Sequence, residues 1–193
     1  MALVPLADIE DLSGHPREVA EAGREQYGQV LNTWAAIMNK PDLFEVYLPF
    51  LRGVAGPGRL EAEVKDLSAL LVATLNNCRY SASHRSTSAR KSGVSDERMR
   101  QVVSGEWSEL SARLRAALEL TRELTLLPPQ ASYAELPYGV HPEARDRAQA
   151  EFDDVELLEL IMSISVWNAL ARFHRVMGFE LDMPVAPEGV DPT

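Results

Sequence analysis

The sequence contains a single cysteine, Cys78, and no long hydrophobic run. One cysteine cannot form an internal disulfide, which is typical of a protein in a reducing cytosol. No stretch reaches the about 18 to 20 apolar residues that a membrane span requires, and the N-terminus lacks the basic start and apolar run of a signal peptide. We therefore expect a cytoplasmic protein that does not interact with a membrane.

Basic residues are scarce as well: 19 Lys and Arg stand against 29 Asp and Glu, for a formal net charge of −10. An acidic chain without a basic stripe repels nucleic acid. There is no G-x-G-x-x-G or Walker pattern, and the four histidines lack H-x-x-x-H or E-x-x-H spacing. The sequence therefore predicts no cofactor and no metal site.

What the sequence does contain is apolar periodicity of the helical kind along nearly all of its 193 residues. We expect helices over residues 16–39, 41–53, 60–75, 77–93, 94–105, 107–126 and 153–177. Without a strand signal, one all-α domain over residues 15–180 follows, between an N-terminal segment 1–14 and a tail 181–193. The proline-rich loop 128–146 is long enough to be a lid or a subunit contact.

The stretch "NNCRYSASHRSTSARKSG", residues 76–93, surrounds the cysteine. In a helix, about 100° per residue brings Arg85 back to within about 20° of Cys78 and places Ser81 about 60° to one side. These three residues are therefore expected on one face. The same count places His84 about 120° away from Cys78, so that it need not face the same pocket.

The longer segment "KDLSALLVATLNNCRYSASHRSTSARKSGVSDERM" resembles the core motif of the carboxymuconolactone decarboxylase / alkylhydroperoxidase D superfamily. Members carry an acidic residue twelve positions before the first cysteine of C-x-x-C-x-x-x-H. Asp66 falls on the acidic position, Cys78 and Ser81 on the two cysteines, and Arg85 on the histidine. The closing segment also resembles the family, with an aromatic-Asn-x-x-x-Arg pattern at Trp167, Asn168 and Arg172.

The resemblance implies a single-domain helical bundle of the alkylhydroperoxidase D-like type that forms a homo-oligomer, either a dimer or a trimer or hexamer. In the dithiol branch of the family, one cysteine attacks peroxide, the second closes a disulfide, and a glutamate and a histidine relay the proton. Ser81 cannot close a disulfide, and Arg85, with a side-chain pKa above about 12, cannot shuttle a proton. The family's two-cysteine peroxidase cycle should therefore not run in this chain.

Asp66 and Arg85 stand where a carboxylate and an imidazole normally meet, which predicts an ion pair that is either catalytic or structural. Cys78 is either a buried inert thiol or a reactive one, since the first turn of a helix and a nearby arginine stabilise thiolate. His84 is either a general base or a histidine at an interface or on the surface. We predict Asp66, Cys78 and His84 as catalytic residues.

The remaining candidates are expected to bind the substrate, and Arg85 offers a fork for a carboxylate. These predicted binding residues are Tyr80, Ser81, Arg85, Trp167, Asn168, Arg172 and His174. For Tyr80, Trp167 and His174 the alternative is ordinary packing between helices.

Three functions fit these residues. The first is a carboxymuconolactone decarboxylase-like enzyme that acts on a small organic substrate, carboxylate- or lactone-bearing, without a dithiol redox cycle. The second is a single-cysteine, peroxiredoxin-like alkylhydroperoxidase whose sulfenate is resolved by an external thiol. The third is a non-catalytic binding or scaffold protein that keeps only the fold.

Overall fold

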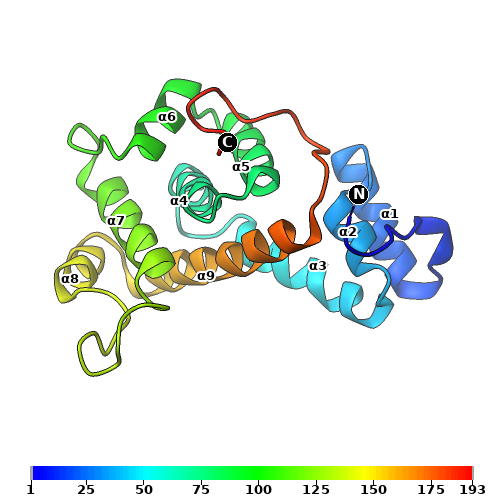
Figure 1. Ribbon diagram of the computed structural model, residues 1–193, viewed down its shortest axis with the longest axis horizontal. Coiled ribbons are helices and arrows are strands. Elements are labelled where there is room, and N and C mark those ends of the chain that lie inside the picture. Colours follow the sequence, from blue (N-terminus) through cyan, green and yellow to red (C-terminus); the bar gives the residue numbers. More distant parts are fainter. Residues whose placement is uncertain (1, 193) are drawn as a thin grey trace.

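The computed structural model describes residues 2–192, which form an all-α domain without a strand (Figure 1). The elements are η1 (Ile9–Asp11), α1 (Gly14–Tyr27), α2 (Asn32–Ile37), α3 (Pro41–Ala55), α4 (Ala62–Leu75), α5 (Arg79–Lys91), α6 (Asp96–Ser104), α7 (Ala112–Leu126), α8 (Pro142–Glu151) and α9 (Asp154–Met177). No helix within residues 2–192 is both long and apolar enough to cross a membrane.

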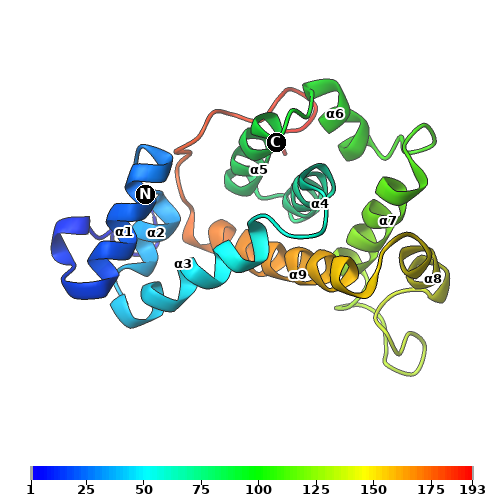
Figure 2. The ribbon, with the colours of Figure 1, turned by 180° about the vertical axis from the view of Figure 1, so that it is seen from behind.

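The long helix α9 runs along one side of the molecule, and α4 packs across it at the centre of the domain (Figure 1). The core gathers around α4, whose Leu67, Leu70 and Val72 are fully buried. Figure 2 shows α3 beside α9 and the helices α1 and α2 beyond it, where a second cluster packs around Trp34 and Phe44. The segment after α9 returns along α5 towards α6 and buries Ala186 and Val190.

Local capping explains where several helices begin. The hydroxyl of Ser95 accepts a hydrogen bond from the Arg98 amide at the start of α6, as the sequence predicts. Asp153 and Glu156 form a capping box at the start of α9.

Three predicted boundaries are wrong. The single helix expected over 16–39 is two helices, because Gly28 ends α1 with a left-handed φ of 77° and Leu31 is extended. The helix expected from residue 107 begins at Ala112 after the cap residue Ser111. The end of the expected loop 128–146 forms the start of α8, which Pro142 opens.

Candidate functional site

The turn between α4 and α5 positions the cysteine. Asn77 has a left-handed φ of 51°, the Cys78 amide donates to the Ala73 carbonyl at 2.9 Å, and the Asn77 amide donates to the Thr74 carbonyl at 2.8 Å. This pair of bonds is a Schellman motif, for which asparagine is a suitable left-handed residue. Cys78 then caps α5, its sulfur accepting a hydrogen bond from the Ser81 amide at 3.4 Å.

Helix α9 holds this turn in place. The Asn168 side-chain oxygen accepts from Asn76 Nδ2 at 2.9 Å, and Asn168 Nδ2 donates to Thr125 Oγ1 at 3.0 Å. Arg172 Nε donates to Asn76 Oδ1 at 3.4 Å. Neither Asn168 nor Arg172 lines the cavity described below, so the structure places both beneath the cysteine turn.

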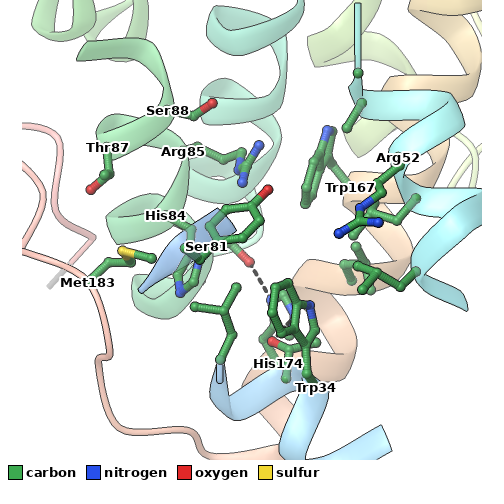
Figure 3. A pocket seen from close by; sticks show the side chains of 18 of the residues that line it. Trp34, Arg52, Ser81, His84, Arg85, Thr87, Ser88, Trp167, His174 and Met183 are labelled. Atoms are coloured by element: carbon green, nitrogen blue, oxygen red, sulfur yellow. Dashed lines mark hydrogen bonds between the residues drawn. The ribbon is translucent and has the colours of Figure 1, made fainter. Parts of the chain in front are cut away.

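A cavity of about 470 Å³ lies between α5, α9 and the N-terminal helices (Figure 3). Of the predicted site residues, those that line it are Tyr80, Ser81, His84, Arg85, Trp167 and His174. Asp66 and Cys78 do not line it. Cys78 is 1% exposed and lies behind Ser81, whose Oγ is 3.1 Å from the sulfur.

A chain of hydrogen bonds starts at this sulfur. Ser81 Oγ lies 2.8 Å from Nδ1 of His174, a contact drawn in Figure 3. The other ring nitrogen of His174, Nε2, lies 3.0 Å from Thr33 Oγ1. Thr33 therefore continues the chain from α9 to α2.

The chain ends on the carboxylate of Asp182. Thr33 Oγ1 donates to the Tyr80 hydroxyl at 3.2 Å, and the Tyr80 hydroxyl donates to Asp182 Oδ2 at 2.6 Å. The same oxygen accepts from the Asn32 amide at 2.7 Å, while His84 Nε2 contacts Oδ1.

The donor and the acceptor of each hydrogen bond in this chain can be assigned by starting from the Asp182 carboxylate. An ionised carboxylate only accepts, so Tyr80 donates to Asp182 and Thr33 donates to Tyr80. His174 Nε2 must then carry the proton that Thr33 accepts, which leaves Nδ1 to accept from Ser81. The Cys78 thiol in turn donates to Ser81. By the same reasoning, neutral His84 donates from Nε2 to Asp182 and keeps Nδ1 as an acceptor.

Electrostatics support the neutral ring of His174 and the ionised carboxyl of Asp182. Burial, assisted by the positive charge of Arg85, lowers the pKa of His174 to about 3, so its ring is neutral at neutral pH. Burial opposes ionisation of Asp182, but hydrogen bonds from His84, Tyr80 and the Asn32 amide hold the pKa of this carboxyl below its ordinary value. Burial, and then the charge of Asp182, raises the pKa of Tyr80.

Arg85 does not form the predicted ion pair with Asp66. Asp66 instead accepts hydrogen bonds from the hydroxyls of Ser88 at 2.8 Å and Ser92 at 2.5 Å. The Arg85 guanidinium stacks on Trp167, 3.9 Å from the ring centroid, and its Nε is enclosed without a partner. Burial lowers the pKa of Arg85, while the more distant charge of Asp66 acts in the opposite direction.

His84 lies in the cavity wall with Ser81 and Tyr80, although the helical count from Cys78 directed it elsewhere. The count fails because Cys78 is a cap residue with φ −101° and ψ 95°, outside the helix. Thr33 and Asp182 were missed, and nothing local in the sequence marks them, since 141 residues separate Thr33 from His174 and 98 separate His84 from Asp182.

Comparisons with known proteins agree with this architecture. Residues 41–123 match the carboxymuconolactone decarboxylase family. The chain is 26% identical over 117 residues to the uncharacterized protein YdfG of Bacillus subtilis (strain 168), covering 59% of this chain and 73% of that protein.

Solved structures show the same fold. A peroxidase-related protein from Ralstonia eutropha JMP134, described as an alkylhydroperoxidase AhpD core, superposes with a TM-score of 0.76 at 15% identity, over 100% of this chain and 98% of that chain. The debrominase Bmp8 superposes with a TM-score of 0.74 at 18% identity, over 97% and 95% of the two chains. Residues 41–123, which include the motif around Cys78, thus match the carboxymuconolactone decarboxylase family, and the chain has the fold of these solved alkylhydroperoxidase-like structures.

Proposed function

We propose that this chain is a carboxymuconolactone decarboxylase-like enzyme that transfers protons on a small organic substrate, carboxylate- or lactone-bearing, without a dithiol redox cycle. One observation carries the proposal: His84 Nε2 contacts the Asp182 carboxylate in the wall of the cavity, which leaves Nδ1 of the neutral ring as a proton acceptor. An imidazole oriented by a buried carboxylate is the usual arrangement of a general base.

In this proposal, His84 Nδ1 removes a proton from the bound substrate, and Asp182 stabilises the imidazolium that forms. The negative charge that develops on the substrate is stabilised by the Arg85 guanidinium in the same cavity. Neutral His174 orients Ser81 and Thr33 through its two ring nitrogens. The proton of the imidazolium, which exchanges with solvent, returns to the substrate or to the product in the second half of the reaction.

The position of Cys78 argues against the single-cysteine peroxidase. A peroxidatic thiolate must reach the peroxide, whereas Cys78 is 1% exposed and covered by Ser81. The neutral ring of His174 at the end of this short chain gives a thiolate no cationic partner. Cys78 is instead a hydrogen-bond donor that fixes the Ser81 hydroxyl.

The test is solvent exchange. A panel of lactones and β-keto acids is incubated with the protein in D₂O and followed by proton NMR, which reports both deuterium incorporation and decarboxylation. We expect a substrate whose reaction slows by about 100-fold or more in His84→Gln, while Cys78→Ser keeps most of the activity because a hydroxyl also donates to Ser81. His15→Gln, an exposed histidine outside the cavity, is the control. Loss of activity in Cys78→Ser with His84→Gln unaffected would contradict the proposal.

A further inference from the structure

The lining of the cavity differs in charge from the rest of the chain. Although the sequence has 29 acidic residues, no aspartate or glutamate lines the cavity in the part of the chain that the structure describes. Three cationic side chains do line it: Arg52, Arg85 and Lys91. The charged side chains that line this cavity are therefore cationic, although the protein as a whole is acidic.

These three cations also have no ion-pair partner within residues 2–192. Two cations outside the cavity that are largely shielded from solvent are paired: Lys65 lies 2.8 Å from Glu159, and Arg113 contacts Glu61 and Glu156, each at 2.8 Å. A largely desolvated charge without a partner is costly. Arg85 is the one such charge among the three, because its enclosed Nε has no hydrogen-bond partner among the described residues, whereas Arg52 and Lys91 are exposed.

The carboxylates of Asp66 and Asp182 cannot fill this role. Asp66 accepts from the Ser88 and Ser92 hydroxyls. Asp182 is held by Tyr80, His84 and a backbone amide. Both carboxylates are satisfied by other donors and lie outside the lining, so the missing anion has to come from a ligand.

The shape of the ligand follows from the aromatic walls. Five of the 13 Phe, Trp and Tyr residues of the chain line this cavity: Tyr27, Trp34, Tyr47, Tyr80 and Trp167. Aromatic side chains pack best against flat conjugated ligands. Arg85 from α5 and Arg52 from α3 point into the cavity from opposite walls, with Trp167 between them (Figure 3).

We propose that the cavity binds a planar aromatic carboxylate, with the carboxylate on the terminal nitrogens of Arg85 and the ring system among the aromatic walls. A guanidinium offers a carboxylate two parallel donors. Its stacking on Trp167 fixes the plane of that fork. Arg52 and Lys91, both exposed, add positive charge around the site and attract the anion. The inference concerns the site of the proposed function, but its test needs no turnover.

The experiment compares three matched probes by calorimetry at low ionic strength. 2-Naphthoate carries charge and a flat ring system, 2-naphthamide the ring system without the charge, and decahydro-2-naphthoate the charge without planarity. We expect 2-naphthoate to bind about tenfold or more tightly than either of the others. Equal affinity for the acid and the amide, or no binding of any probe, would overturn the proposal.

Variants test whether Arg85 is the residue that binds the carboxylate of the probe. Arg85→Met should weaken 2-naphthoate binding by about tenfold or more and leave 2-naphthamide unchanged. Arg147→Met, which removes an exposed arginine of α8 outside the cavity, should change binding by less than about twofold. If Arg85→Met does not fold, Arg85→Lys keeps the charge but loses the fork and should bind with intermediate affinity. Unchanged 2-naphthoate binding in the folded Arg85 variant would refute the assignment.

The two proposals fail separately. Selective, Arg85-dependent binding of 2-naphthoate without any His84-dependent proton transfer would leave the binding site standing and remove the proposed function. His84-dependent turnover of neutral substrates that Arg85→Met does not affect would support the proposed function and refute the carboxylate-binding site.

Discussion

Ser81 occupies the position between the buried thiol and His174, with its Oγ 3.1 Å from the sulfur and 2.8 Å from Nδ1. Ser81→Cys should therefore place a second thiol within bonding reach of Cys78. We expect mild oxidation to close an intrachain disulfide, seen as loss of both free thiols, without hydroperoxide turnover, because Arg85 still cannot relay a proton. The control is Ser83→Cys. The Ser83 hydroxyl donates to the Met183 and Pro184 carbonyls and not towards Cys78, so both thiols of this variant should stay reduced. A Ser81→Cys protein that keeps both thiols free would contradict the geometry.

His174 should make stability depend on pH. Its pKa is about 3 in the folded protein, against 6.5 for an unperturbed histidine. Between these values only the unfolded chain binds the proton, so the free energy of unfolding should fall as the pH drops through this window, by about 1.4 kcal/mol per pH unit. Urea unfolding at about pH 7.5 and about pH 4.5 should show a shallower loss in His174→Gln, which cannot titrate. Equal losses in the two proteins would mean that His174 is not buried in its neutral form.

Among individual residues, the sequence predicts Tyr80, Ser81, Arg85, Trp167 and His174 as site residues. All five line the cavity. Each belongs to a segment with a recognisable local pattern. The partners of Asp66 and Arg85 could not be predicted in the same way. A helical count shows which residues of one helix share a face. It does not reveal that the Ser88 and Ser92 hydroxyls donate hydrogen bonds to the Asp66 carboxylate.

Among the elements, the turn between α4 and α5 determines where the thiol lies, because Asn77 holds a left-handed conformation with φ 51°. Asn77→Ala should cost about 1 kcal/mol of unfolding free energy, since a Cβ without a side-chain hydrogen bond is disfavoured there. Asn77→Gly should be close to neutral. Urea denaturation of the two variants tests this. An alanine variant as stable as wild type would contradict the left-handed assignment.

The segment after α9 supplies Asp182, which the sequence marks only as part of a tail. Asp182→Asn should release the His84 ring from its fixed tautomer, because an amide nitrogen can take the place of the accepting oxygen. Long-range ¹H–¹⁵N spectra should show neutral His84 protonated on Nε2 in wild type and a mixture of tautomers in the variant. A wild-type ring protonated on Nδ1 would contradict the proposed base.

Helix prediction succeeded where the signal is local and failed where it is not. The capping side chains of Ser95 and Asp153 mark where α6 and α9 begin. The break at Gly28 lies within an apolar pattern that continues from α1 into α2, so periodicity alone joins the two helices. The polar segment that forms α8 has almost no apolar stripe to predict it.

For the whole molecule, self-association stays a prediction. Large apolar side chains are exposed on α3 and on α9, two helices that contact each other (Figure 2): Leu43, Val46, Phe50, Val155 and Leu158. We propose that a second copy covers some of these side chains. Sedimentation at micromolar concentration should then show a species larger than the 21.4 kDa chain, and Leu158→Glu should shift it towards the monomer. A 21.4 kDa wild-type species would refute the proposal.

The central claim is that imidazoles in the cavity, and not a thiol cycle, carry the chemistry. The most direct measurement is the rate at which hydrogen peroxide oxidises Cys78, followed by intact mass for the native protein and for the same protein unfolded in urea. Because Cys78 is 1% exposed and covered by Ser81, we predict that native Cys78 reacts no faster than the unfolded thiol. Native oxidation about 100-fold faster than that of the unfolded chain, with turnover of peroxide in the presence of an external thiol, would contradict this claim.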